Sequence, residues 1–211
     1  MRRRLSIVTW MLLPCLVVAA EPDAGSLIAG LAREAPARTA YTEVRFAQML
    51  DRPLIVRGEL AYLGPGSLGK RVDTPYKEEV TIADGQVSVQ RGSRQPRQIS
   101  LGQVPELDGF LRGFGALLGG DAQALARDFE IQTRGDASRW HLSLVPKDAR
   151  LKRRVASIEV DGAADSARCF SVIDADGDAN IMLVEAMAAI ELPKPLTRRN
   201  LEIVCAGTAA K

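Results

Sequence analysis

Acidic side chains in the last third of the chain are the first groups in this sequence that could do chemistry. A calcium-binding loop carries oxygen ligands at positions one, three, five, seven and twelve, and these positions are filled here by Asp174, Asp176, Asp178, Asn180 and Glu185. The glycine that such a loop needs at position six is replaced by Ala179, and the flanking segments 170–172 and 181–183 alternate like strands. We therefore predict a hairpin turn here and no metal site.

The sequence also offers no set of residues that would form a catalytic centre. His141 is the only histidine in 211 residues. It alternates away from Trp140 and Leu142, which indicates a surface or hydrogen-bonded side chain rather than a general base. No serine or cysteine comes with a base and an orienting partner of its own. The sequence predicts no catalytic residue, no cofactor and no enzyme.

The first twenty residues have the order of a secretory signal. Arg2 to Arg4 form a basic start, the apolar stretch 5–18 follows, and small residues precede a cleavage site after Ala20. An uncleaved anchor is the first alternative, although the stretch is short for a membrane span. Lipidation at Cys15 is the second, and Pro14 before it argues against this. We expect a signal peptide over residues 1–20, export to the periplasm, and a single domain over residues 21–211.

The charge balance disfavours nucleic acid as a partner. The chain has 28 Lys and Arg against 26 Asp and Glu, but three arginines lie in the signal segment. The remainder has 28 minus 3, or 25, basic residues against 26 acidic ones, a net charge of −1. A basic cluster in 147–154 either docks an acidic partner or is a solvated surface.

Two cysteines, Cys169 and Cys205, remain beyond the signal segment. An even count in an oxidising compartment fits a disulfide. Two buried thiols are the alternative, because both residues have apolar neighbours.

Short alternating strands separated by turns dominate the chain and predict about ten or eleven strands in an antiparallel sheet. The clearest hairpin joins 80–82 to 87–89 through Asp84-Gly85, a pair that accepts the dihedrals of a tight turn. Ser26 is expected to cap a short helix before the strands.

The segment 104–128 interrupts the strands and predicts two helices, the second beginning at Asp121. The first helix has an apolar stripe but contains Gly109, Gly113 and Gly115, each costing up to about 1 kcal/mol relative to alanine. These glycines suit a lid that lifts from an apolar surface. They equally suit a helix that lies close on the sheet.

The order of these segments resembles the periplasmic outer-membrane lipoprotein carrier family, LolA. The likeness extends from about residue 24 to 205 and includes the segments 46–48, 57–62, 65–68, 82–85 and 174–178. One departure is that Gly64, and not a basic residue, precedes Pro65, so the family's usual lid latch is missing. Lys70 or Arg71 could replace it, although strand alternation favours a solvated position.

The resemblance implies a mainly β fold: an incomplete antiparallel β-barrel, or half-barrel, that encloses a hydrophobic cavity under short helices. It implies a monomeric carrier that shields acylated lipoprotein or lipid cargo between the inner and outer membranes. Its partners would be an inner-membrane lipoprotein-releasing transporter and an outer-membrane acceptor. Divergent members resemble proteins linked to lipid-linked aryl polyene pigments, so a carrier for one such product is an alternative. A scaffold module with a permanently closed half-barrel is another.

The expected cargo contacts are the large apolar residues of the sheet and of the lid. They are Phe46, Leu60, Tyr62, Ile82, Trp140, Leu142 and Leu144 from the strands and Phe110, Leu111, Phe114 and Leu117 from the helix. Ordinary core packing is the alternative for each of them, because an apolar strand face must be covered by something.

Overall fold

The computed structural model describes residues 23–103 and 105–207, without the side chains of residues 105–107 and 110. The expected signal peptide, its cleavage site and Cys15 lie outside the described residues. None of the described helices is long and apolar enough to cross a membrane.

The sheet is a single antiparallel structure, and it is not closed. Within the described ranges it has 11 strands in the order β6-β5-β4-β3-β2-β1-β11-β10-β9-β8-β7. The strands are β1 (Ala37–Phe46), β2 (Leu54–Gly64), β3 (Ser67–Thr74), β4 (Glu78–Ala83), β5 (Gln86–Arg91), β6 (Arg97–Ser100), β7 (Phe129–Asp136), β8 (Arg139–Pro146), β9 (Val155–Ala163), β10 (Ser166–Asp174) and β11 (Ala179–Val184). This confirms the predicted mainly β class and the incomplete barrel.

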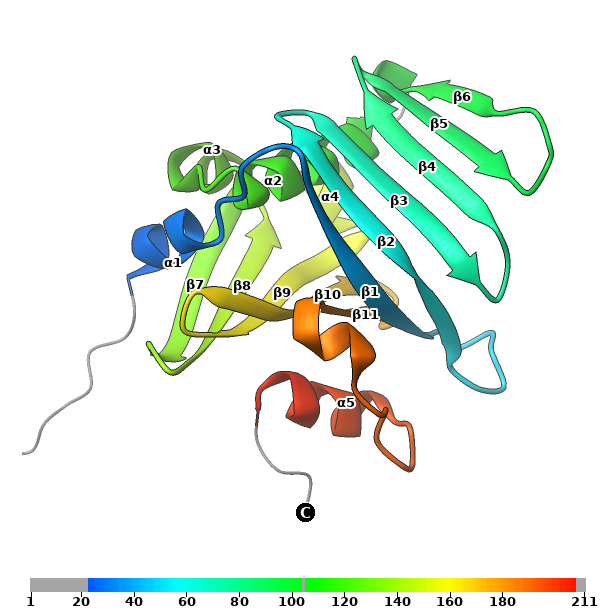
Figure 1. The fold of residues 1–211 in the computed structure, drawn as a ribbon. Helices are drawn as coiled ribbons and strands as arrows, with labels where there is room; N and C mark the ends of the chain where they lie inside the picture. Colours follow the sequence, from blue (N-terminus) through cyan, green and yellow to red (C-terminus); the bar gives the residue numbers. More distant parts are fainter. Residues whose placement is uncertain (1–22, 104, 208–211) are drawn as a thin grey trace, which may run out of the picture.

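Helices lie at both ends of the curved sheet (Figure 1). Those described are α1 (Ala24–Gly30), α2 (Pro105–Leu118), α3 (Ala122–Asp128), α4 (Ala149–Lys152) and α5 (Arg198–Cys205), with the 3-10 helices η1 (Leu101–Gln103) and η2 (Glu185–Ala189). Helices α1, α2 and α3 gather at one end of the sheet, whereas α5 lies beside β10 and β11 at the other (Figure 1). The α1 cap differs from the prediction, because the Asp23 carboxylate accepts the Ser26 N–H and makes Asp23 the N-cap.

Local turn chemistry explains several boundaries. Asp84 and Gly85 have φ angles of 51° and 70°, as a two-residue hairpin turn requires, and they join β4 to β5 as predicted. Asp121 caps α3 by accepting the N–H of Ala124, also as predicted. The 174–178 segment is the hairpin turn between β10 and β11.

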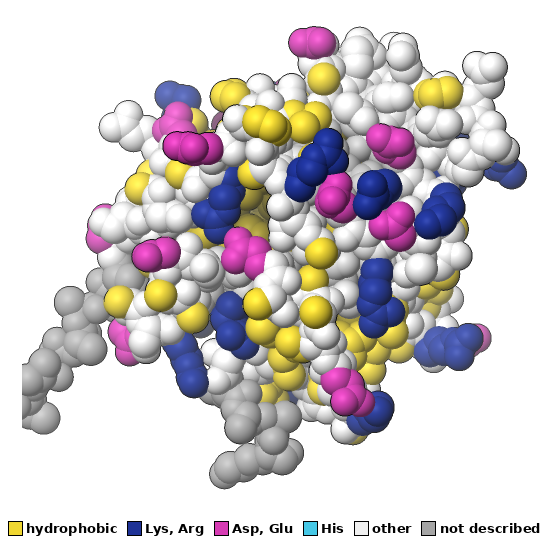
Figure 2. Space-filling view, viewed as in Figure 1, with side chains coloured by type: hydrophobic (Ala, Val, Ile, Leu, Met, Phe, Trp, Pro, Cys, Tyr) yellow, Lys and Arg dark blue, Asp and Glu magenta, His cyan; other side chains and the backbone are white. Residues whose placement is uncertain are grey.

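Apolar residues are buried on both sides of the sheet, whereas Lys and Arg side chains are interspersed with Asp and Glu side chains over the face of the molecule shown in Figure 2. The larger core cluster lies on the concave side and includes Val56, Leu142, Leu144, Ile158 and Val160 together with residues of α1, α2 and α3. The smaller cluster lies between α5 and the convex faces of β1, β10 and β11.

The smaller cluster contains a covalent link. Cys169 on β10 and Cys205 at the end of α5 form a disulfide with a Cα–Cα distance of 5.6 Å. Arg168 reinforces the contact, because its Nε donates to the carbonyl oxygen of Cys205 at 2.9 Å. Helix α5 is therefore fastened to the outside of the sheet.

Candidate functional site

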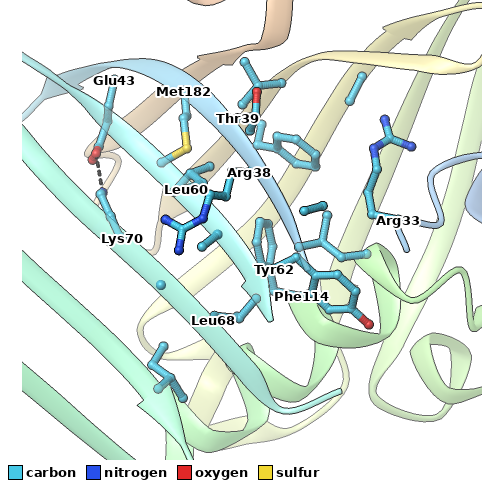
Figure 3. Close-up of a pocket in the computed structure, with 18 of the residues that line it drawn as sticks. Arg33, Arg38, Thr39, Glu43, Leu60, Tyr62, Leu68, Lys70, Phe114 and Met182 are labelled. Carbon is cyan, nitrogen blue, oxygen red and sulfur yellow. Dashed lines mark hydrogen bonds and ion pairs between the residues drawn. The ribbon is translucent and has the colours of Figure 1, made fainter. Parts of the chain in front are cut away.

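A cavity of about 630 Å³ lies between the concave face of the sheet and helix α2 (Figure 3). Its wall is mostly apolar and comes from β1 to β4, β10, β11 and α2. The apolar lining residues are Leu31, Ala37, Leu60, Ala61, Tyr62, Leu68, Val80, Ile82, Leu111, Phe114, Leu118, Ala167, Phe170, Val172, Met182 and Val184. Strand alternation produces this wall, because every second residue of each strand points to the same side.

Five of the eleven predicted cargo contacts lie at this cavity. They are Leu60, Tyr62 and Ile82 from the strands and Leu111 and Phe114 from α2. The ring of Phe114 meets the edge of Phe170 with centroids 5.5 Å apart, so the lid contacts the far strands through an aromatic pair.

Four other predicted contacts belong to the packed core instead. Leu117, Trp140, Leu142 and Leu144 are each at most 3% exposed and do not line the cavity. The indole of Trp140 lies over Gly162 on the neighbouring strand, and its Nε1–H donates to the carbonyl of Ala164 at 2.8 Å. Helices cover the concave face of β8, so its apolar residues pack into the core and do not line a cavity.

The two remaining predicted contacts lie elsewhere. Phe46 packs into the smaller cluster on the convex side together with Val44, two residues before it on β1. The alternate residue Glu43 faces the cavity instead. The side chain of Phe110 lies outside the described part of the structure.

Several lining residues were missed by the sequence reasoning. Phe170 and Val172 on β10 and Met182 and Val184 on β11 face the cavity. Their alternation is visible in the sequence, but the pairing of β11 with β1, which brings them beside Leu60, is a long-range contact that alternation alone does not reveal.

A charged pair lies at one end of the cavity. Figure 3 shows Glu43 and Lys70 at this end, away from Tyr62 and Phe114 near the lid. The Lys70 ammonium donates to Glu43 Oε2, and the Arg45 Nε–H donates to Glu43 Oε1 at 2.8 Å. The Glu43 side chain is only 5% exposed, so the pair is set into the wall.

The two cations keep Glu43 ionised. Burial alone would raise the pKa of Glu43, but the Lys70 ammonium and the Arg45 guanidinium outweigh burial and lower it below its usual range. Glu43, Lys70 and Arg45 together carry one negative and two positive charges. This end of the cavity therefore has a positive local balance.

Tyr41 packs beside the charged pair. Lys70 Nζ lies 5.1 Å from the centroid of the Tyr41 ring, a cation–π contact. The Tyr41 hydroxyl is buried and has no hydrogen-bond partner among the described residues. Burial and the nearby Glu43 charge raise the pKa of Tyr41, so its hydroxyl keeps its proton and is a hydrogen-bond donor without an acceptor.

The position of Lys70 differs from the solvated one that strand alternation favoured. Lys70 lines the cavity, whereas Arg71, on the other face of β3, is more than half exposed and pairs with Asp73. Within the described ranges neither side chain bonds to α2, and the lid is held by other contacts. The backbone N–H of Arg33 donates to the carbonyl of Leu118 at 2.9 Å and joins α1 to the end of the lid.

The glycines of the lid differ in their surroundings. A Cβ atom on Gly113 would lie 2.1 Å from the ring of Phe129, so this glycine permits close packing. A Cβ on Gly115 would meet nothing nearer than 4.0 Å. A second cavity of about 730 Å³ lies beside Gly115, between α2 and the β2–β3 turn. The close-packing reading therefore applies to Gly113, and the reading of a lid that lifts stays a prediction for Gly115.

His141 has two acidic neighbours on the convex side of β8 and β9. Its Nδ1 lies 2.9 Å from Asp161 Oδ1, and its Nε2 lies 3.0 Å from Glu159 Oε2, a charge contact without hydrogen-bond alignment. The hydrogen bond to Asp161 and the contact with Glu159 raise the pKa of His141 to about 9. No group of three or more His, Cys, Asp or Glu in the described ranges has metal-binding geometry.

The comparisons with known proteins place these features in a family. The model of a family described as "Outer membrane lipoprotein carrier protein LolA-like" matches residues 17–207. No curated protein sequence matches the chain.

Solved structures are similar to this chain at low identity. A LolA superfamily protein, NE2245 from Nitrosomonas europaea, is 15% identical, with 86% of this chain and 99% of that one covered and a TM-score of 0.42. A DUF1329 family protein from Desulfovibrio piger is 10% identical over 84% and 95%, with a TM-score of 0.42. LprF from Mycobacterium bovis is 12% identical over 83% and 99%, with a TM-score of 0.35.

Proposed function

Because the chain belongs to the LolA-like family of outer membrane lipoprotein carrier proteins, we propose that it is a non-enzymatic periplasmic carrier that shields acyl chains in transit from the inner to the outer membrane. The observation that carries the proposal is the apolar cavity of about 630 Å³ under α2. A scaffold with a solid interior would have no use for such a space. The mature domain would be residues 21–211, exported by the signal at 1–20.

The size of the cavity favours a small cargo. A methylene group is close in size to a water molecule, whose share of liquid volume is about 30 Å³. The cavity then holds roughly 20 such groups, which is one long acyl chain and not three. A carrier for a single lipid-linked product is therefore the second candidate, and an enclosed triacylated lipoprotein would need the half-barrel to widen.

Partial shielding also suits delivery. Burial of a methylene group is worth about 0.8 kcal/mol, so 16 buried groups amount to about 13 kcal/mol before the costs of binding. This is enough to hold a chain in water and small enough to allow transfer to an acceptor. The inner-membrane transporter and outer-membrane acceptor remain proposed partners.

A pair of variants on one strand tests the carrier function. Leu60 lines the cavity, whereas Leu63, three residues further along β2, is 40% exposed. Leu60→Asp should abolish uptake of a hydrophobic fluorescent dye and the copurification of acyl lipids detected by mass spectrometry. Leu63→Asp should leave both intact. Equal uptake by a folded Leu60→Asp protein would overturn the carrier proposal.

A further inference from the structure

The charged end of the cavity has donors that the protein itself does not use. Lys70 carries three N–H donors, and Glu43 is its only hydrogen-bond acceptor among the described residues. The Lys70 side chain is 26% exposed and lines the cavity, so its remaining donors are within reach of a bound molecule.

A purely hydrocarbon guest would fit this end poorly. It would cover the ammonium of Lys70 without offering an acceptor, and a charged group removed from water needs a partner. Between this end and the lid the wall includes the apolar residues Leu60, Met182, Tyr62 and Phe114 (Figure 3). Two further cations line the cavity, and each has an acidic partner: Arg33 pairs with Glu185 and Arg38 with Glu59. Lys70 thus offers unused donors at one end of the cavity, and apolar residues lead from it to the lid.

The net charge at this end of the cavity decides which kind of polar head group binds there. Glu43 already neutralises one of its two cationic neighbours, Lys70 and Arg45, and the second leaves an excess positive charge. An anionic group gains from this excess and accepts hydrogen bonds from the unused donors. A cationic head group would be repelled by the same excess.

We infer that the ligand of this cavity is a single hydrocarbon chain with an anionic head group, which lies against Lys70 while the chain runs toward Tyr62 and Phe114 beneath α2. The inference rests on the proposed carrier function and adds the class of ligand to it. Glu43 is a positioning residue, because it holds the Lys70 ammonium at the cavity wall.

The test compares two probes that differ only in the head group. cis-Parinaric acid, a fluorescent fatty acid, and its methyl ester are titrated into the delipidated protein at neutral pH. The acid should bind roughly tenfold or more tightly than the ester, as expected for charge-assisted hydrogen bonds. Each titration should saturate at one chain per protein. Equal affinities, or three chains per protein, would overturn the inference.

Charge variants give opposite expectations for the affinity ratio of acid to ester. Lys70→Met should reduce the ratio to about one. Glu43→Gln keeps an oxygen that can accept from Lys70 but removes the competing negative charge, so it should raise the ratio. Lys70→Met leaves Glu43 paired with Arg45 alone, and the double variant Glu43→Gln with Lys70→Met removes the buried carboxylate altogether. Because the ligand loses its Lys70 donor in both, the ratio of the double variant should also fall below that of the parent. Lys77→Met is the matched control, since Lys77 is 70% exposed outside the cavity.

The outcomes separate the two proposals. A folded parent protein that binds neither probe contradicts the carrier function itself. A parent that binds both probes equally keeps the carrier function and contradicts the anionic head group. A ratio unchanged in folded Lys70→Met and in the double variant contradicts the role of Lys70.

Discussion

The lid glycines allow the motion of α2 to be tested by adding one methyl group. Gly115→Ala places a Cβ where the nearest atom is 4.0 Å away, so the new side chain meets no obstacle. Alanine is favoured over glycine in a helix interior by about 1 kcal/mol. A release step that requires part of α2 to unwind should then slow by about fivefold, the factor that corresponds to 1 kcal/mol.

Gly113→Ala is the opposing variant on the same helix. Its Cβ would lie 2.1 Å from the ring of Phe129, which is 1% exposed and has little room to move. Overpacking of this kind costs about 1–3 kcal/mol, which exceeds the helix gain. We expect a lower free energy of unfolding and faster release.

The assay combines equilibrium unfolding in urea with the release of a bound fluorescent dye to excess lipid vesicles. Gly115→Ala should unfold at higher urea and release more slowly, and Gly113→Ala should do the reverse. An unchanged release rate in a stabilised Gly115→Ala protein would show that α2 moves as a rigid body. This result would refute the prediction that the glycines let part of α2 unwind during release.

Three further predictions concern stability. Replacement of Cys169 and Cys205 by serine should cost about 4 kcal/mol from loop-closure entropy over a separation of 36 residues, measured by urea unfolding with and without a thiol reductant. The pKa of His141 is raised to about 9, so its contribution is complete below about pH 6.5 and is lost as the pH rises through 9. Because a third of the side chain is exposed, the loss should be about 1 kcal/mol between pH 6.5 and 9.5, and His141→Gln should remove this pH dependence. Leu142→Ala should cost about 2–5 kcal/mol as a core cavity, whereas Leu60→Ala should cost less and weaken dye uptake, and equal effects of the two would contradict the distinction between core and cavity.

Local patterns predicted the elements well. The Asp84-Gly85 turn, the cap at Asp121 and the described part of the apolar stripe of α2, from Leu111 to Leu118, depend on neighbouring residues and are present in the structure. The number of strands also followed from alternation, because each strand repeats with a period of two regardless of its partner.

The side of the sheet on which each residue lies was harder to predict. In β1 the apolar residues Val44 and Phe46 face outward against α5, and the acidic Glu43 faces the cavity. Alternation divides a strand into two faces but does not say which face is inside when both are covered. The polar end of the cavity was missed for this reason, since alternation favoured a solvated position for Lys70.

Support from α5 reaches only one half of the sheet. The disulfide and the smaller core cluster back β1, β10 and β11 from outside, while no described helix makes substantial contact with β3 to β6. We therefore expect strands β3 to β6 to move more readily than β1, β10 and β11. A bulkier ligand would be accommodated by movement of β3 to β6, while Glu43 on the supported strand β1 would keep its position beside the bound ligand.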